Sequence, residues 1–231
     1  MLTEFQRSAL KTVSAASENR GFALAGGAAL ILQGLVDRQT RDLDFFARES
    51  SAVNETCPII EAALRSDGID VSRVVDAPGF IRLEISQHGE KCEVDLGNDA
   101  RTRPEVNIPP FGNVLAPEEL AADKTLALFG RAAARDFVDV FFLAQHFEED
   151  RLCELAREKD SGFDERHFRE ALQAFGRLDR DLFEVDEKTF RSIRTWTIAW
   201  REQLQRQEIE RSGPSTELDH IDGLSYYLPD F

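Results

Sequence analysis

The chain has 231 residues, of which 42% are hydrophobic, and it carries a formal net charge of −15. This length suits one domain or two small ones, and 17 Phe residues spread along the chain exclude a disordered protein. No stretch approaches the roughly 18 continuous apolar residues of a membrane span, and the acidity argues against binding nucleic acid over a broad surface, without excluding a local basic groove.

The cysteines and the amino-terminal stretch indicate in which cellular compartment the protein is expected. Cys57, Cys92 and Cys153 are far apart and include no CxxC pair, which argues against a disulfide framework or a zinc site. Residues 1–20 are typical of a polar-faced helix and lack the apolar core of a signal peptide. We therefore expect a cytoplasmic protein with reduced thiols.

The first half of the chain alternates between helix and strand patterns. A helix over 2–18 precedes a short buried strand, FALAG, and a short helix, GAALILQGL. RDLDFFA predicts the second strand, and NETCPIIEAALRSDG predicts a helix with Pro58 near its first turn. Three alternating segments then predict a meander of strands, before a proline-rich connector over 100–113: DVSRVVD, GFIRLEIS and KCEVDLG.

After residue 115 the sequence becomes helical. APEELAADKTLALFG has a helix start at Pro117 and a stop at Gly130. Three further helices are predicted over 134–147, 164–176 and 186–207. The last has an apolar seam formed by Phe190, Ile193, Thr197, Trp200 and Leu204. We therefore expect an α/β domain over residues 1–115 and a helical domain over 116–231.

Asp42 and Asp44 are the first candidates for a chemical site. Residues two apart on a strand share a face, so these carboxylates lie side by side and repel unless a cation neutralises them. Mg²⁺ prefers oxygen ligands and bridges carboxylates to substrate phosphates. In KCEVDLG, Asp95 faces outward if its apolar neighbours face the core, and it is the candidate for a third ligand.

Gly26 and Gly27 stand between the first strand and the following helix, where bare backbone N–H groups suit a phosphate. Taken alone, this pair is more often a tight turn, and Asp42-Leu43-Asp44 is more often part of a surface strand. The conjunction of the glycines, the paired aspartates and Asp95 favours one site.

This part of the sequence resembles the first motif of the polymerase-β-type nucleotidyltransferases, which is an apolar residue, two small residues, a short helix and Asp-apolar-Asp. LAPEELAADKTLALFGRAAARDFVDVFFL is similar to the second half of the AbiEii/AbiGii toxin group. The resemblance covers roughly residues 20–145. It implies an α+β fold, with a mixed nucleotidyltransferase sheet flanked by helices and a helical carboxy-terminal domain that completes the cleft.

The resemblance implies catalytic, metal-binding roles for Asp42, Asp44 and Asp95, with two Mg²⁺ ions as cofactors. Asp136, in RDFVD, matches a further acidic position that is needed in some members. Asp139 has two alternative interpretations, as an anchor for Arg135 or for its own helix.

The resemblance also implies a nucleotide site. Gly26 and Gly27 would cradle phosphates, and Thr40 matches a position close to the triphosphate. Lys124 would contact the triphosphate as a catalytic point charge. Arg131 lies on the same helix face, seven residues further on.

The predicted reaction is transfer of a nucleoside monophosphate from an NTP to an acceptor hydroxyl, in the toxin of a toxin–antitoxin pair, with the 3′ end of tRNA as one acceptor. The resemblance implies a cognate antitoxin, and the lack of a long apolar stretch argues against a membrane partner. Two alternatives stay open: a nucleotidyltransferase for small molecules of the aminoglycoside type, and an idle module that binds nucleotide or protein. The tail over 213–231 is aromatic and acidic, and we expect it to pack on the body or to bind a partner.

Overall fold

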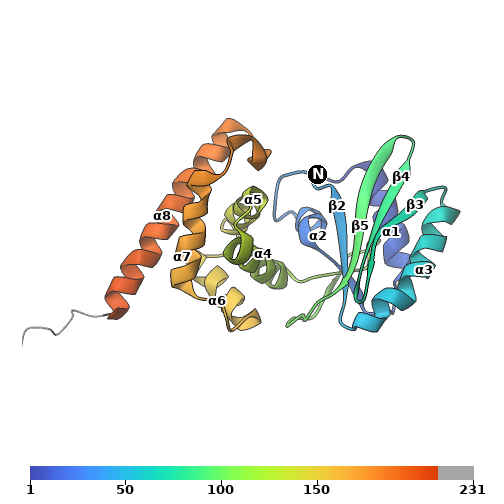
Figure 1. The fold of residues 1–231 in the computed structure, drawn as a ribbon, viewed down its shortest axis with the longest axis horizontal. Helices are drawn as coiled ribbons and strands as arrows, with labels where there is room; N and C mark the ends of the chain where they lie inside the picture. The colour runs from blue at the N-terminus through green and yellow to red at the C-terminus, as the bar shows by residue number, and fades with distance from the viewer. Residues whose placement is uncertain (213–231) are drawn as a thin grey trace, which may run out of the picture.

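A seven-stranded mixed sheet forms the amino-terminal half of the protein in the computed structural model, which describes residues 1–212 (Figure 1). The expectation for the tail over 213–231 therefore lies outside the described residues. The strand order is β3-β4-β5-β2-β1-β7-β6, with β2 parallel to β5 and antiparallel to β1. The strands are β1 (Phe22–Ala25), β2 (Asp42–Ala47), β3 (Asp70–Ala77), β4 (Phe80–Gln87), β5 (Glu90–Asn98), β6 (Val106–Asn107) and β7 (Asn113–Val114).

The central strands bury one face and direct polar side chains to the other. In β2, Leu43 and Phe45 are buried, whereas Asp42 and Asp44 are half-buried on the opposite face. The apolar residues of β4 and β5 likewise face the core. This alternation follows from the pleat of a strand, and it places the polar residues of three neighbouring strands on one surface.

Helices cover the two faces differently. α1 (Glu4–Ala16) and α3 (Ser50–Ser66) pack on the buried face of the sheet. The short α2 (Gly26–Leu32) contacts β1, β2 and the helical half on the other side (Figure 1). Polar side chains of the sheet therefore lie beside α2, in the space between the two halves.

The second half is helical from Pro117 to Ser212, and α8 lies on its far side (Figure 1). Pro117 starts α4 at a position where its missing N–H costs nothing. The apolar seam of α8 is confirmed, with its largest residue, Trp200, only 1% exposed. The elements are α4 (Pro117–Arg131), α5 (Ala134–Leu143), α6 (Glu149–Lys159), α7 (Glu165–Gln173), the 3₁₀ turns η1 (Ala174–Arg177) and η2 (Arg180–Phe183), and α8 (Glu187–Ser212).

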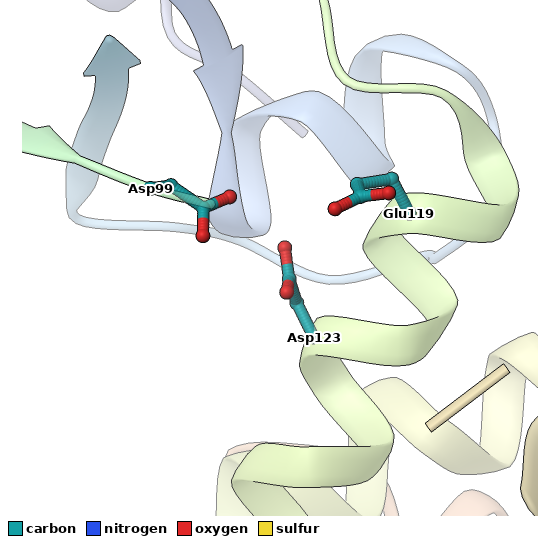
Figure 2. Close-up of side chains that lie close together, drawn as sticks. All are labelled: Asp99, Glu119 and Asp123. Carbon is teal, nitrogen blue, oxygen red and sulfur yellow. The ribbon is translucent and has the colours of Figure 1, made fainter. Parts of the chain in front are cut away.

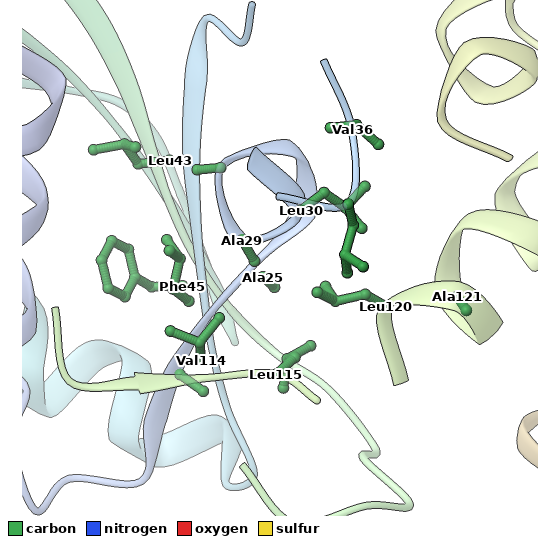
Figure 3. Close-up of a cluster of buried hydrophobic side chains, with 14 of the residues drawn as sticks. Ala25, Ala29, Leu30, Val36, Leu43, Phe45, Val114, Leu115, Leu120 and Ala121 are labelled. Atoms are coloured by element: carbon green, nitrogen blue, oxygen red, sulfur yellow. The ribbon is translucent and has the colours of Figure 1, made fainter. Parts of the chain in front are cut away.

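One apolar cluster joins the halves. Figure 3 shows Leu30 of α2 and Leu115, which follows β7, beside Leu120 of α4, and all three are fully buried. Burial of such side chains contributes on the order of 2 kcal/mol each, so this cluster fixes α4 against the sheet.

Several local predictions needed correction. α2 ends at Leu32 and α5 at Leu143, before the predicted ends at 35 and 147, and Pro58 lies in the middle of α3. That proline is tolerated because Asn54, whose carbonyl loses its helical partner, is exposed. The predicted connector contains β6 and the start of β7, which at two residues each are too short to show a strand pattern. The predicted helices lack α6, because its sequence is rich in charge.

Candidate active site

Asp42, Asp44 and Asp95 come together on one surface, because parallel pairing of β2 with β5 places Asp44 opposite Asp95. Asp42 lies two residues earlier in β2 on the same face. Thr40 donates a hydrogen bond from Oγ1 to Asp42 Oδ1 at 2.8 Å, which fixes that carboxylate. The structure thus brings together the three aspartates and the threonine that the sequence singled out.

Asp44 is the least compensated of the three. Burial raises its pKa to about 6, and the negative charge of Asp42 adds to the effect. Within residues 1–212 its carboxylate has no hydrogen-bond or ion-pair partner. A carboxylate pair in this state is stabilised by a cation, which is the chemistry expected of Asp42 and Asp44 as ligands of a divalent metal.

Asp95 differs because Arg82 of β4 already pairs with it. The guanidinium donates to Oδ1 and Oδ2 of Asp95, both at 2.7 Å, and also lies 3.3 Å from Glu93. Asp95 is 6% exposed and does not line the cleft described below. Asp95 could ligate a metal only through the carboxylate lone pairs that Arg82 does not occupy. The free carboxylate oxygens therefore suit a cation best at Asp42 and Asp44.

The glycines lie against the same surface. A Cβ atom on Gly26 would lie 1.7 Å from Asp44 Oδ2, and the φ angle of Gly26 is +61°. The close contact leaves no room for a Cβ atom, and residues other than glycine rarely adopt this positive φ angle, so both facts require glycine here. A Cβ atom on Gly27 would lie 2.9 Å from Thr40 Oγ1. The glycine turn and the aspartates are therefore two walls of one site.

Lys124 and Arg131 of α4 face this surface from the helical half. Lys124 is ion-paired at 2.9 Å with Asp139 and lies close enough to Asp44 to lower its pKa in part. Arg131, half exposed, also borders the space between the halves. Both cations are where an anionic substrate would meet them.

Asp136 and Asp139 lie behind these cations. Asp136 is fully buried and accepts two hydrogen bonds from Arg131, at 2.8 and 2.7 Å, and one from the backbone N–H of Ala133. Asp136 lies outside the lining of the cleft, so its geometry favours orienting Arg131 over touching substrate.

Asp139 holds two cations, and neither is the expected Arg135. Its carboxylate binds Arg38, which lies between α2 and β2, as well as Lys124. Arg135 instead lies 3.9 Å from Asp42. Burial alone would raise the pKa of Asp139, but the charge of Lys124 and the hydrogen bond from Arg38 lower it below its ordinary value.

These groups line an open cleft of about 1350 Å³ between the sheet and the helical half. One wall carries Gly26, Gly27 and the β2 aspartates, and the other carries Lys124 and Arg131. Residues of η2 also line the cleft, and Glu184, which follows η2, pairs there with Arg41. The volume is sufficient for a nucleotide and part of a second substrate.

A second group of carboxylates, formed by Asp99, Glu119 and Asp123, lies at the junction of the halves (Figure 2). The ammonium group of Lys159 already occupies its centre, 2.8 Å from Glu119, 3.2 Å from Asp99 and in contact with Asp123. Glu119 also accepts hydrogen bonds from Thr102. Because Lys159 supplies the positive charge, this group suits a metal less well than Asp42 and Asp44.

Sequence reasoning missed three residues: Arg38, Arg82 and Lys159. Arg82 could have been found, because its alternating strand places it on the face of Asp95. Arg38 and Lys159 find their partners only through the packing of the two halves, for which no local pattern exists.

The fold and the cleft define a class of enzyme, the nucleotidyltransferases. The family model described as "Nucleotidyl transferase AbiEii toxin, Type IV TA system" matches residues 8–217. The chain therefore belongs to this family of nucleotidyltransferase toxins.

Two solved structures from Helicobacter pylori share the fold at low identity. JHP933 from Helicobacter pylori has 22% identity and a TM-score of 0.56, with 92% of this chain and 98% of that chain covered. A putative nucleotidyltransferase from H. pylori has 20% identity and a TM-score of 0.54, covering 90% and 100%. MenT4, a nucleotidyltransferase toxin from Mycobacterium tuberculosis H37Rv, has 18% identity and a TM-score of 0.48, covering 91% and 83%. A search of curated proteins gave no significant match.

The sequence predicts no helix that spans a membrane. Among the helices within residues 1–212, none is both long enough and apolar enough to cross a bilayer.

Proposed function

We propose that this protein is a Mg²⁺-dependent enzyme that transfers a nucleoside monophosphate from an NTP to an acceptor hydroxyl and releases pyrophosphate. The observation that carries the proposal is the carboxylate of Asp44, which has no hydrogen-bond or ion-pair partner within residues 1–212 and lies beside Asp42 and against Gly26 in a cleft with cations opposite. We further propose the division into a catalytic domain, 1–115, and a helical domain, 116–231.

Asp42 and Asp44 would hold the metal, with Asp95 beside them. A bound divalent ion would supply Lewis acidity and neutralise charge that develops on the transferred phosphoryl group. The chain's own residues prepare this site: Thr40 orients Asp42, and Arg82 fixes Asp95.

The nucleotide would lie with its phosphates between the glycine turn and α4. Lys124 and Arg131 would offset the charge of the triphosphate, and Asp136 would keep Arg131 in place. Gly26 and Gly27 would allow the phosphates to approach the backbone closely, because no Cβ atom intervenes.

The proposed biological role is that of a cytoplasmic toxin with a cognate antitoxin and the 3′ end of tRNA as acceptor. Family membership supports the toxin role. The net charge of −15 requires that RNA contact a local surface, such as the arginines at the cleft, and not a broad one.

A transfer assay tests this proposal. The purified protein is incubated with Mg²⁺ and each of the four α-³²P-labelled NTPs, with total tRNA, an aminoglycoside or no acceptor. Label on tRNA supports the proposal, and label on the aminoglycoside would replace it with the small-molecule alternative. No transfer to any acceptor, with NTP still bound, would leave only an idle nucleotide-binding module.

The matched control compares two aspartates. Asp44→Ala should abolish transfer, whereas Asp70→Ala, at an exposed aspartate that starts the edge strand β3, should leave it unchanged. In cells, wild-type expression should slow growth, and Asp42→Ala or Lys124→Ala should relieve the effect. Equal toxicity of wild type and Asp44→Ala would contradict the proposed chemistry.

A further inference from the structure

Arg38 lies beside the glycine turn, although no motif singled it out. A Cβ atom on Gly27 would lie 2.8 Å from Nη2 and 3.2 Å from Nη1 of Arg38. The side chain of Arg38 is 14% exposed, and the residue lines the cleft. Its guanidinium is therefore adjacent to the bare backbone of Gly27.

The hydrogen bonds of Arg38 leave donors available in the cleft. Nε and Nη2 donate to Asp139 at 2.5 and 2.9 Å, and Nη1 donates to the Gln39 carbonyl at 2.6 Å. A guanidinium has five N–H donors, so two remain without a partner in the described part of the chain, one on each terminal nitrogen. These nitrogens are the ones beside Gly27.

Lys124 reaches the same carboxylate from α4. Its Nζ lies 2.9 Å from Asp139 Oδ2, the oxygen that also accepts from Arg38 Nη2. Two cations from different halves thus meet on one fully buried carboxylate. Asp139 alone supplies one negative charge for these two cations. Against the effect of burial, Asp42 and Asp44 also raise the pKa of Arg38, so both cations, which line the cleft, lie within electrostatic reach of the paired aspartates.

An arginine that only links the two halves would not need unpaired N–H donors in the cleft or a second cation on the same carboxylate. Arg103 serves as the comparison: it lies near the buried carboxylate of Glu119 at 3.6 Å and contacts Glu158, so it has two acidic partners. Arg103 is outside the lining of the cleft. In the Arg38 cluster, two cations share a single acid and keep donors beside the glycines.

We propose that Arg38 contacts the terminal phosphates of the nucleotide together with Lys124, and that Asp139 is the positioning residue that holds both. This inference rests on the proposed function and extends it. It would make the site favour a chain of several phosphates over a single phosphate, because a longer anion can contact a metal at the aspartates and both cations at once.

Isothermal titration calorimetry with inorganic tripolyphosphate and orthophosphate, in Mg²⁺ buffer, tests the proposal on the full chain without assuming a base. Wild type should bind tripolyphosphate more tightly than orthophosphate. Arg38→Met should weaken tripolyphosphate binding by roughly 10-fold to 100-fold, the usual effect of losing charge-assisted hydrogen bonds. Arg103→Met, the matched control at the junction, should stay within about twofold of wild type.

Transfer kinetics on the same proteins supply a second measurement. Arg38→Met should raise KM for the NTP by more than it lowers kcat, a pattern that loss of a purely structural contact would not produce. If Arg38→Met does not fold, Arg38→Gln, which keeps a donor for Asp139 and lacks the charge, carries the same expectations.

The outcomes separate this inference from the proposed function. Transfer activity with equal tripolyphosphate affinity in wild type and the Arg38 variants overturns the role of Arg38 and leaves the proposed function intact. Arg38-dependent binding of tripolyphosphate without transfer to any acceptor supports the phosphate site and overturns the proposed reaction. Failure of wild type to bind tripolyphosphate overturns the inference.

Discussion

Replacing Asp44 by Asn should stabilise the metal-free protein while abolishing transfer. The substitution keeps the shape of the side chain and removes its charge. In the wild type, burial and Asp42 raise the pKa of Asp44 from 3.8 to about 6. Ionised Asp44 therefore opposes folding, and Asn removes this opposition together with the metal ligand.

The magnitude follows from proton linkage. A difference of about two pKa units corresponds to about 3 kcal/mol at neutral pH, and partial exposure reduces the expected gain to about 1–3 kcal/mol. Varying the pH checks the sign of this effect. Because the pKa of Asp44 is higher in the folded state, ionised Asp44 destabilises the fold fully above about pH 6 and not at all below its pKa in the unfolded chain, near 4. At pH 5 the gain should be about half of that at pH 7.5.

Urea unfolding in EDTA at pH 5 and 7.5 measures the effect. Added Mg²⁺ should stabilise wild type more than Asp44→Asn, because only wild type keeps the paired carboxylates. Asp95→Asn is the contrasting variant and should be less stable than wild type, since it disrupts the pair with Arg82. The reasoning is refuted if Asp44→Asn is no more stable than wild type in EDTA at pH 7.5.

Three further substitutions test other parts of the site. Gly26→Ala should cost about 2 kcal/mol or more of stability and lose activity, because the methyl group meets Asp44 at a positive φ; wild-type behaviour in urea unfolding would contradict this. Lys159→Met should destabilise by about 3–5 kcal/mol by leaving three carboxylates without their cation, and an unchanged thermal midpoint would show that these acids are solvated. Asp136→Ala should cost about 0.5–2 kcal/mol through the lost bond from Ala133 and should raise KM for the NTP; an unaltered KM would exclude the orienting role.

The fold class followed from the sequence because its patterns are local. The alternation of β2 and β5 placed Leu43 and Val94 in the core, and therefore Asp44 and Asp95 on the opposite face. The pairing of β2 with β5 is not local: the chain passes through α3, β3 and β4 between them. Only the chemistry of the aspartates suggested that these strands meet.

The partners of the charged residues were not predictable in this way. The ion pair between Arg82 and Asp95 makes Asp95 less available than its place beside Asp44 suggests. The contact between Arg38 and Asp139 joins residues 101 positions apart, across two halves of the molecule. Such pairs depend on how the halves pack, which hydrophobic periodicity does not encode.

That long separation also has a consequence for synthesis of the chain. At a translation rate of about 5–20 residues per second, Asp139 is made roughly 5–20 seconds after Arg38. Until Asp139 and Lys124 emerge from the ribosome, the sheet carries its aspartates without the opposite wall of the cleft. If the proposed site is correct, we expect a nascent chain of this kind to be inactive while its first half folds and to gain its complete site only after the helical half has been made.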